Sequence, residues 1–287
     1  MKQLNLFIEL IRLKKPIGFM LLFWPCAWGL TLAYDFSNNL NDYFFYLILF
    51  FLGSVLMRSA GCIVNDITDK EFDKKVERTK NRPIASNKIS IKLAIFYTVI
   101  LCSLAFLVLI NFNNLTIILA LGSMPLAFTY PLMKRYTYWP QLFLGITFNY
   151  GLILGWICIK GNFDIAPIVF YLGAIFWTLG FDTIYGYQDI KDDEIIGVKS
   201  TSIKFKKNPK LFLTICYLIF TLSLIVTSLL MEFSRAFYYF IPFIVLHLFF
   251  YQIYNFKLKN VKDNLKKFKS NNLFGAIVLL SILMGKV

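Results

Sequence analysis

Residues 43–57, YFFYLILFFLGSVLM, form an uncharged run that leads directly into the polar segment 58–75, RSAGCIVNDITDKEFDKK. A helix needs about 20 mostly apolar residues to cross a bilayer, and this run with its flanks is long enough. The stretch therefore predicts a membrane-spanning helix that ends in an acidic segment.

The whole chain of 287 residues has the same character, with 58% hydrophobic, 18% aromatic and 16% charged residues. A soluble domain of this length would alternate apolar and polar faces, so the composition favours an all-α integral membrane protein. We expect one domain over residues 1–287 with nine spans. Their approximate ranges are 16–34, 43–62, 92–110, 115–132, 140–159, 164–183, 211–230, 236–254 and 271–287.

Basic residues are unevenly distributed between the expected linkers. Of the 30 Lys and Arg residues, all but Lys160, Arg235 and Lys286 fall on one side of the membrane. Because Lys and Arg collect on the cytoplasmic side, we expect the N-terminus inside and the C-terminus outside. The net charge of +14 then follows from topology, and nucleic-acid binding is not expected. The N-terminal segment matches neither a cleaved signal nor a transit peptide, so we expect a multi-pass protein of a bacterial inner membrane whose active-site loops face the cytoplasm.

A polar stripe follows the first apolar run. Asn65, Asp69 and Asp73 are four residues apart, and Asp66 is adjacent to them. On a helix each step of four turns the chain by about 400°, so the three side chains project within an arc of roughly 80°. Such side chains repel one another unless a positive charge lies against them. The stripe therefore predicts a cation site.

A second stripe repeats this spacing with Tyr185, Asp189 and Asp193, and Asp182 lies one turn earlier. Both stripes end spans that run in the same direction, so we expect both to face one cavity. Acids at membrane depth are costly and usually mark a functional site. The alternative is that each stripe is a solvated helix end whose charge is offset by neighbouring lysines.

Oxygen ligands without His or Cys indicate a hard cation. The single histidine, His247, lies in the eighth expected span, where we expect it to pack between helices. Mg²⁺ typically takes one or two carboxylates, several waters and the oxygens of a phosphorylated substrate. The stripes therefore predict a Mg²⁺–diphosphate site, provided that basic side chains meet the remaining phosphate charge.

Basic side chains are present near both stripes. Arg58 precedes Asn65 by two helical turns inside an apolar span, where an unpaired guanidinium is costly. Arg82 belongs to the segment ERTKNRP, and Lys134 and Arg135 follow the fourth expected span. We expect Arg82 and Arg135 to contact substrate and Arg58 to pair with substrate or with an acid. Lys134 fits substrate binding or membrane topology equally, and topology accounts for most other lysines.

These segments resemble the signatures of a known family. Residues 58–83, RSAGCIVNDITDKEFDKKVERTKNRP, are similar to the first acidic signature of the UbiA-type intramembrane aromatic prenyltransferases, and residues 182–201, DTIYGYQDIKDDEIIGVKST, to the second. Residues 12–30, RLKKPIGFMLLFWPCAWGL, and 130–156, YPLMKRYTYWPQLFLGITFNYGLILGW, resemble the branch that prenylates 4-hydroxybenzoate for ubiquinone. One departure is Lys14, which stands where the opening motif usually has an acid.

The resemblance implies nine helices around a central cavity, N-terminus cytoplasmic, and Mg²⁺-dependent transfer of a polyprenyl group from polyprenyl diphosphate to the position ortho to the hydroxyl of 4-hydroxybenzoate. The implied metal ligands are Asn65, Asp66, Asp69, Asp73, Asp189 and Asp193. The implied substrate-binding residues are Arg12, Arg58, Arg82, Lys134, Arg135 and Tyr185. The implied catalytic residues are Asp69, Asp73, Asp189, Asp193 and Arg135.

Two alternatives stay open. The acidic signatures are shared by prenyltransferases that act on haem, naphthoate or homogentisate. A cation-coupled transporter is the alternative from another class, and it predicts acids at mid-membrane in broken helices. The donor chain length, the oligomeric state and the base that takes the ring proton are not determined by the sequence.

Overall fold

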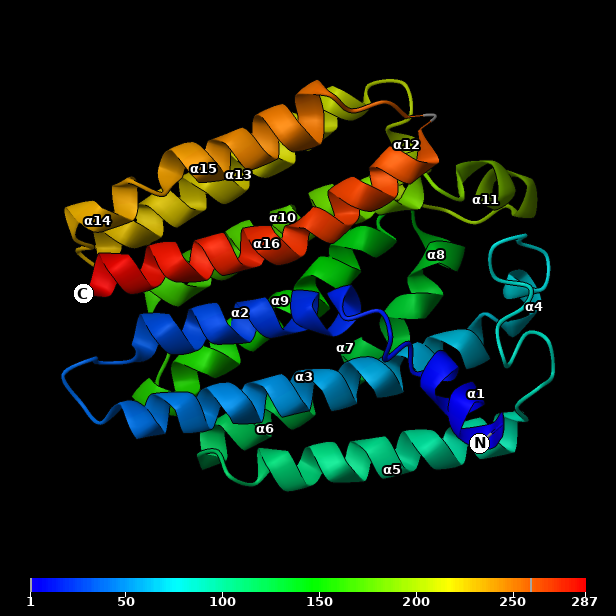
Figure 1. Ribbon diagram of the computed structural model, residues 1–287, viewed down its shortest axis with the longest axis horizontal. Helices are drawn as coiled ribbons and strands as arrows, with labels where there is room; N and C mark the ends of the chain where they lie inside the picture. The colour runs from blue at the N-terminus through cyan, green and yellow to red at the C-terminus, as the bar shows by residue number, and fades with distance from the viewer. Residues whose placement is uncertain (1, 259) are drawn as a thin grey trace.

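The computed structural model describes residues 2–258 and 260–287, which contain helices and connecting segments and no β-strand (Figure 1). The 3₁₀-helix η1 and the π-helix η2 each continue an α-helix. The elements are α1 (Lys2–Leu10), α2 (Ile17–Ala33), α3 (Leu40–Thr68), α4 (Lys70–Asp73), α5 (Ile91–Leu109), α6 (Asn114–Gly122), α7 (Met124–Thr129), η1 (Tyr130–Leu132), α8 (Met133–Tyr136), α9 (Pro140–Lys160), α10 (Ile165–Gly186), α11 (Ile190–Ile196), α12 (Thr201–Lys204), α13 (Pro209–Leu230), α14 (Arg235–Tyr238), α15 (Ile241–Val245), η2 (Leu246–Tyr254) and α16 (Val261–Lys286).

The predicted all-α membrane class is confirmed. In the described part of the chain, eight helical segments are long and apolar enough to cross a membrane. They are Leu40–Thr68, Ile91–Leu109, Asn114–Tyr136, Pro140–Lys160, Ile165–Gly186, Pro209–Leu230, Arg235–Tyr254 and Val261–Lys286. The expected first span is the apolar helix α2, which has 17 residues, so the count of nine stays a prediction, as does the orientation of the N-terminus.

The last helix begins ten residues earlier than expected, at Val261 instead of 271. Residues 261–270 are mostly polar, so the sequence pattern did not assign them to a membrane span, but they are helical. Asn260 caps the helix by accepting a hydrogen bond from the backbone N–H of Asp263, and Lys267 forms an ion pair with Asp263 at 3.1 Å. A cap and an i,i+4 pair are both features that stabilise a helix start.

Helix α2 lies against α9 at very close range. A Cβ atom at Gly29 would lie 1.9 Å from the carbonyl oxygen of Leu152, and one at Gly155 would lie 2.4 Å from that of Cys26. Small residues of this kind let two membrane helices bring their backbones together. The pair α2–α9 therefore depends on glycine at both positions.

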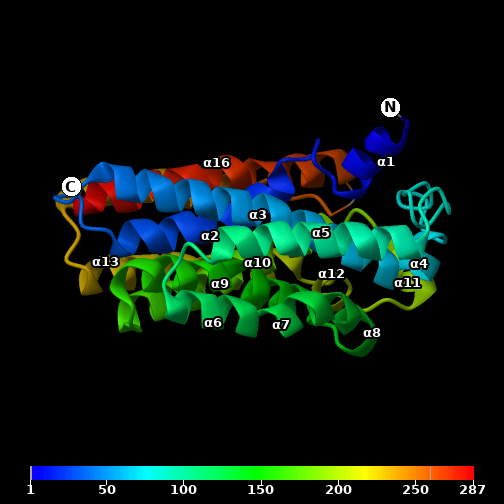
Figure 2. The same cartoon turned by 90° about the horizontal axis from the view of Figure 1, so that it is seen from below.

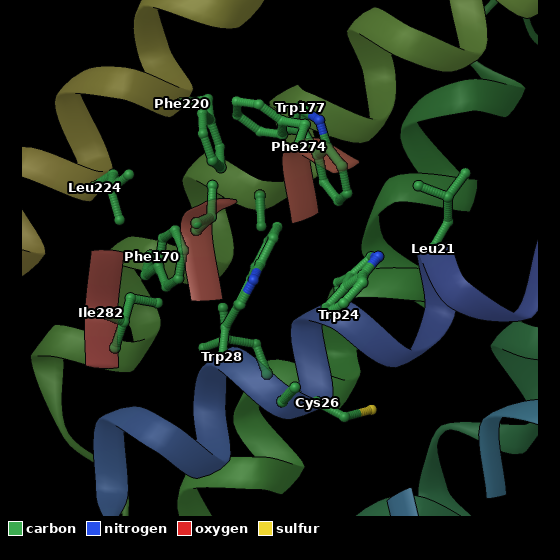
Figure 3. Close-up of a cluster of buried hydrophobic side chains, with 14 of the residues drawn as sticks. Leu21, Trp24, Cys26, Trp28, Phe170, Trp177, Phe220, Leu224, Phe274 and Ile282 are labelled. Atoms are coloured by element: carbon green, nitrogen blue, oxygen red, sulfur yellow. The ribbon is translucent and has the colours of Figure 1, made fainter. Parts of the chain in front are cut away.

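An aromatic cluster fills the space between α2, α10, α13 and α16 (Figure 3). The ring of Trp28 lies 5.1 Å from that of Trp177, 5.4 Å from Phe170 and 6.3 Å from Phe220, measured between centroids. Its indole N–H donates to the carbonyl of Gly275 at 3.0 Å. These contacts join four helices at the centre of the bundle.

Four short helices lie at one end of the bundle. Two views at right angles show α1, α4, α8 and α11 together at this end and the C-terminus at the other (Figures 1 and 2). The end with the short helices carries both acidic stripes, because α4 continues α3 and α11 continues α10.

Candidate active site

A cavity of about 850 Å³ opens among the short helices. It is lined from both acidic stripes, by Asn65, Asp66, Asp69, Asp73, Tyr185, Asp189 and Asp193. Of the basic residues singled out in the sequence, Arg12, Arg58, Arg82 and Lys134 also line it. Arg135 is absent from the lining. The two stripes, more than a hundred residues apart in sequence, thus face one space.

Backbone hydrogen bonds keep the first stripe in register although α3 ends at Thr68. The N–H of Asp69 donates to the carbonyl of Asn65 at 2.9 Å, and that of Asp73 to the carbonyl of Asp69 at 2.8 Å. In the second stripe the N–H of Asp193 donates to the carbonyl of Asp189 at 2.9 Å. Each break in the helix therefore preserves the four-residue period.

Asp66 is the most heavily neutralised acid of the site. Its Oδ1 accepts from Nη2 of Arg12 at 2.5 Å and from Nη1 of Arg82 at 3.2 Å, and its side chain is 2% exposed. The same Arg82 nitrogen donates to Asp73 at 2.8 Å. Arg12 adopts a positive φ of 54°, which is uncommon for a residue with a side chain and costs about 1 kcal/mol or more. With this backbone conformation, the guanidinium of Arg12 pairs with Asp66. It is therefore not free to bind a substrate.

Asp69 pairs with a different cation. Nζ of Lys134 donates to its Oδ2 at 2.5 Å, while its Oδ1 is buried and has no partner among the described residues. Burial raises the pKa of the Asp69 carboxyl, and the neighbouring Lys134 ammonium partly offsets this. A buried carboxylate oxygen without a partner is costly, and such a position suits a cation.

Arg135 points elsewhere. Its Nη2 donates to the carbonyl oxygen of Thr68 at 2.6 Å, and its guanidinium lies 5.2 Å from the centroid of the Phe72 ring. It thereby binds a free carbonyl at the end of α3, where a cation is favourable. The expected contact of Arg135 with substrate is therefore not supported by its placement.

Arg78 lies in the segment that follows the first stripe and binds the second stripe, and the sequence did not single it out as a site residue. Its Nε lies 2.8 Å from Oδ1 of Asp189 and its Nη2 lies 2.5 Å from Oδ2, a bidentate pair, while Nη1 lies 3.4 Å from the hydroxyl of Tyr185. The signal was present in ERTKNRP, which supplies both Arg78 and Arg82. The choice between them depended on contacts with α11, which sequence spacing does not specify.

Asp193 has no ion pair among the described residues. Burial and the nearby negative charge of Asp189 raise the pKa of its carboxyl to about 7. At the mouth of the cavity, burial and the positive charges of Arg12, Arg78 and Arg82 lower the pKa of Lys15. The site thus combines closely spaced acids with a concentrated positive field.

No group of three or more His, Cys, Asp or Glu side chains within residues 2–258 and 260–287 is close enough to hold one metal ion. Four of the acids, Asp66, Asp69, Asp73 and Asp189, instead pair with arginine or lysine side chains of the same cavity. The donor set still fits Mg²⁺, because it consists of oxygen atoms and because Oδ1 of Asp69 is buried without a partner.

Arg58 differs from the other basic residues of the cavity. Its Nε is buried without a hydrogen-bond partner among the described residues, and it forms no ion pair with any of them. Its guanidinium lies 5.6 Å from the centroid of the Phe148 ring. A cation in an apolar wall with free N–H groups suits an anionic group.

His247 lies outside the cavity lining, as expected. Its ring stacks on Phe274 with centroids 4.9 Å apart, and its Nε2 lies 3.1 Å from Nε2 of Gln252. These contacts agree with packing between helices and give no support to a metal-binding role.

Known proteins resemble this chain along its whole length. The model of the UbiA prenyltransferase family matches residues 22–278. A mitochondrial 4-hydroxybenzoate polyprenyltransferase of Rattus norvegicus is 40% identical over 287 residues, which cover 100% of this chain and 76% of the relative. The protein of the same name from Drosophila pseudoobscura pseudoobscura is 42% identical over 280 residues, or 97% of this chain and 70% of the relative.

Solved structures share the fold. A UbiA homologue from Aeropyrum pernix K1, in its apo form, has a TM-score of 0.78 at 23% identity and covers 94% of this chain and 99% of its own. A UbiA homologue from Archaeoglobus fulgidus, bound to GPP and Mg²⁺, has a TM-score of 0.69 at 17% identity and covers 97% of this chain and 99% of its own.

The relatives correct one expectation. Those from rat, fruit fly and Arabidopsis thaliana are mitochondrial enzymes, so the expected location in a bacterial inner membrane is contradicted, while the multi-pass membrane character stands. The matching family model and the identity over the full chain lead to one conclusion: this chain belongs to the UbiA prenyltransferase family.

Proposed function

We propose that this protein transfers a polyprenyl group from polyprenyl diphosphate to the carbon ortho to the hydroxyl of 4-hydroxybenzoate, with Mg²⁺, as a step toward ubiquinone. The observation that carries the proposal is one cavity in which two acidic stripes meet Arg78, Arg82 and Lys134, with the unpaired Arg58 in its wall. A diphosphate needs metal ligands and cations, and an aromatic acid needs a further cation. The names of the relatives support the same substrates.

The residues that would hold Mg²⁺ are the oxygen donors of the stripes. They are Asn65, Asp69, Asp73, Asp189 and Asp193, with Asp66 beside them. When bound, Mg²⁺ supplies positive charge that stabilises the diphosphate leaving group. The fit rests on the free Oδ1 of Asp69 and on a donor set made of oxygen atoms.

The basic partners of these acids are proposed to exchange partners when donor binds. Lys134, Arg82 and Arg78 now neutralise carboxylates, and their long side chains line the same cavity. With the acids engaged by metal, the three cations are free to donate to diphosphate oxygens. Arg135, which holds the carbonyl of Thr68, is proposed to fix the end of α3 instead.

Bond breaking occurs at the allylic end of the donor. The bond from C1 to the diphosphate oxygen breaks, both electrons leave with the diphosphate, and an allylic cation remains. Arg82 and Lys134 stabilise the charge that builds on the leaving oxygen. The rings of Phe148 and Tyr185 line the cavity, where aromatic faces stabilise the cation and keep water from it.

The acceptor carboxylate is proposed to bind Arg58. Arg12, which the resemblance also places among the substrate-binding residues, is engaged by Asp66. Arg58 has free N–H groups and lies beside the Phe148 ring, which suits a benzoate that stacks on an aromatic side chain. The ring carbon ortho to the hydroxyl then forms a bond to C1 of the donor, and the ring loses a proton.

A transporter fits less well. It requires acids at mid-membrane in broken helices, whereas Asp69, Asp73, Asp189 and Asp193 follow the ends of the spans Leu40–Thr68 and Ile165–Gly186.

Acceptor competition tests the proposal. Membranes containing the protein are incubated with polyprenyl diphosphate, Mg²⁺ and labelled 4-hydroxybenzoate, homogentisate, a naphthoate or haem, beside membranes that lack the protein. We expect a labelled lipid from 4-hydroxybenzoate. If a labelled lipid formed only from another aromatic compound or haem, that compound would replace 4-hydroxybenzoate as the proposed acceptor. If no labelled lipid formed from any of them, the proposed prenyltransferase activity would be refuted.

A further inference from the structure

Asp182 is a carboxylate of the cavity that neither stripe nor ion pair accounts for. It lies in α10, one turn before Tyr185, and lines the cavity. It forms no ion pair or hydrogen bond with the described residues. Asp66, Asp69, Asp73 and Asp189, which line the same cavity, are each paired with Arg or Lys. An ionisable side chain inside a membrane helix is costly unless it has a function.

The charged neighbour of Asp182 is Arg58, on the facing helix α3. The positive charge of Arg58 acts on Asp182, and both charges act on the hydroxyl of Tyr130. All three side chains line the cavity. Arg58 and Asp182 nevertheless do not form an ion pair. Two opposite charges that line one cavity without pairing with each other are both open to a ligand in that cavity.

The substrate proposed above fits this space. If the carboxylate of 4-hydroxybenzoate binds Arg58, the ring extends into the region bordered by Asp182. The ortho carbon lies closer to the acceptor carboxylate than the phenolic oxygen does, since the hydroxyl is at the far end of the ring. The edge of the ring that loses a proton thus lies between the carboxylate held by Arg58 and the hydroxyl, within the cavity that Asp182 also lines.

We propose that Asp182 accepts the ring proton after the new carbon–carbon bond has formed. This inference rests on the proposed function. Attack on the allylic cation leaves hydrogen and the prenyl group on one ring carbon, with positive charge on the ring. The C–H bond then breaks, its electron pair restores aromaticity, and the proton passes to an oxygen of Asp182 and on to water at the cavity mouth. A carboxylate here also stabilises the positive ring before the proton leaves.

The other acids are less suited to this step. A carboxylate held by Arg or Lys is a weaker base, and Asp193, which is unpaired, belongs to the stripe proposed to bind metal. Glu9, which also lines the cavity, is exposed at its edge. The carboxylate of Asp182 lines the cavity and has no ion-pair partner among the described residues.

The test is Asp182→Asn, which keeps size and removes the base. We expect the rate of prenyl transfer to fall by roughly 10²–10⁴-fold, the usual contribution of a general base. With 4-hydroxybenzoate deuterated at both ortho positions, we expect a primary isotope effect larger in the variant than in the unsubstituted protein. Binding of inorganic diphosphate with Mg²⁺ should stay within about twofold, because Asp182 contacts neither Arg82 nor Lys134. Binding of labelled 4-hydroxybenzoate should be retained, because Arg58 is kept and forms no ion pair with Asp182.

Asp164→Asn is the matched control, at the opposite end of α10. Asp164 accepts from the N–H of Ala166 at 2.9 Å, and Asn caps a helix equally well, so its rate should be unchanged. A variant Asp182→Asn with normal rate and no larger isotope effect would overturn the inference, as would loss of diphosphate or acceptor binding. If the unsubstituted protein makes no prenylated 4-hydroxybenzoate, the proposed function fails instead.

Discussion

Lys134 and Asp69 form an ion pair with Nζ and Oδ2 2.5 Å apart, while the other oxygen of the same buried carboxylate has no partner among the described residues. If Asp69 holds Mg²⁺ as proposed, a lysine in this position competes with the metal ion for Asp69 and becomes free to bind diphosphate once the metal is present. Metal and diphosphate should therefore each favour the binding of the other.

Replacing Lys134 tests this exchange. In Lys134→Met we expect Mn²⁺, used as a spectroscopic probe for Mg²⁺, to bind about tenfold more tightly without donor, because a competing charge a few ångströms away is gone. We expect Mg²⁺–diphosphate to bind more weakly. Both are measured by titration of the purified protein.

Lys199→Met is the control, since Lys199 lines the same cavity but donates to the carbonyl of Tyr136 rather than to an acid. It removes the same charge without removing an ion pair. Equal metal affinity gains in the two variants would show that general charge, and not the pair with Asp69, is responsible.

The acids of the two stripes should be individually required. We expect Asp69→Ala and Asp189→Ala each to lower the rate of prenyl transfer by at least about 100-fold, since each removes a proposed metal ligand from a site with few. Asp42→Ala, in the first turn of the same α3, should retain activity. Membrane fractionation measures whether each variant is inserted normally. Normal turnover in Asp69→Ala or Asp189→Ala would remove that residue from the site.

Arg58 should select for the acceptor carboxylate. In Arg58→Met we expect KM for 4-hydroxybenzoate to rise by about 10- to 100-fold, the value of a charge-assisted hydrogen bond, with KM for the donor unchanged. The neutral analogue 4-hydroxybenzamide should lose much less in the variant. Equal losses for both acceptors would mean that Arg58 supports the wall of the cavity and does not bind the carboxylate.

Substitution of two glycines tests the close packing of α2 against α9. Gly29→Ala should lower the thermal unfolding temperature in detergent, because its Cβ would lie 1.9 Å from the carbonyl of Leu152 and overpacking costs about 1–3 kcal/mol. Gly53→Ala, in the helix α3 with nothing within 4 Å of the added atom, should leave the temperature unchanged or raise it. A stable Gly29→Ala protein would contradict the close approach of α2 and α9.

The sequence predicted what depends on local period and composition. The apolar runs gave the helical class, and the four-residue spacing of Asn65, Asp69 and Asp73 gave a stripe that survives the end of α3 at Thr68. Consecutive membrane spans alternate in direction, so the second and sixth expected spans run the same way. The two stripes that follow these spans were therefore expected at one end of the molecule.

The sequence did not predict which side chains each arginine of the site contacts. The sequence put Arg135 on substrate and left Arg78 out, whereas Arg135 binds the carbonyl of Thr68 and Arg78 binds Asp189. Side-chain partners across helices depend on crossing geometry, which residue spacing does not encode. Arg12 reaches Asp66 from a backbone with positive φ, a conformation that an arginine gives no reason to expect.

Transfer by the purified protein tests the central claim most directly. The protein is stripped of metal, reconstituted in vesicles and given polyprenyl diphosphate and ring-labelled 4-hydroxybenzoate, and the product is identified by mass spectrometry and NMR. The account predicts no product without metal, and on addition of Mg²⁺ a product carrying the prenyl group on the carbon ortho to the hydroxyl. Product formation that is independent of divalent metal, or a prenyl group on oxygen instead of carbon, would contradict it.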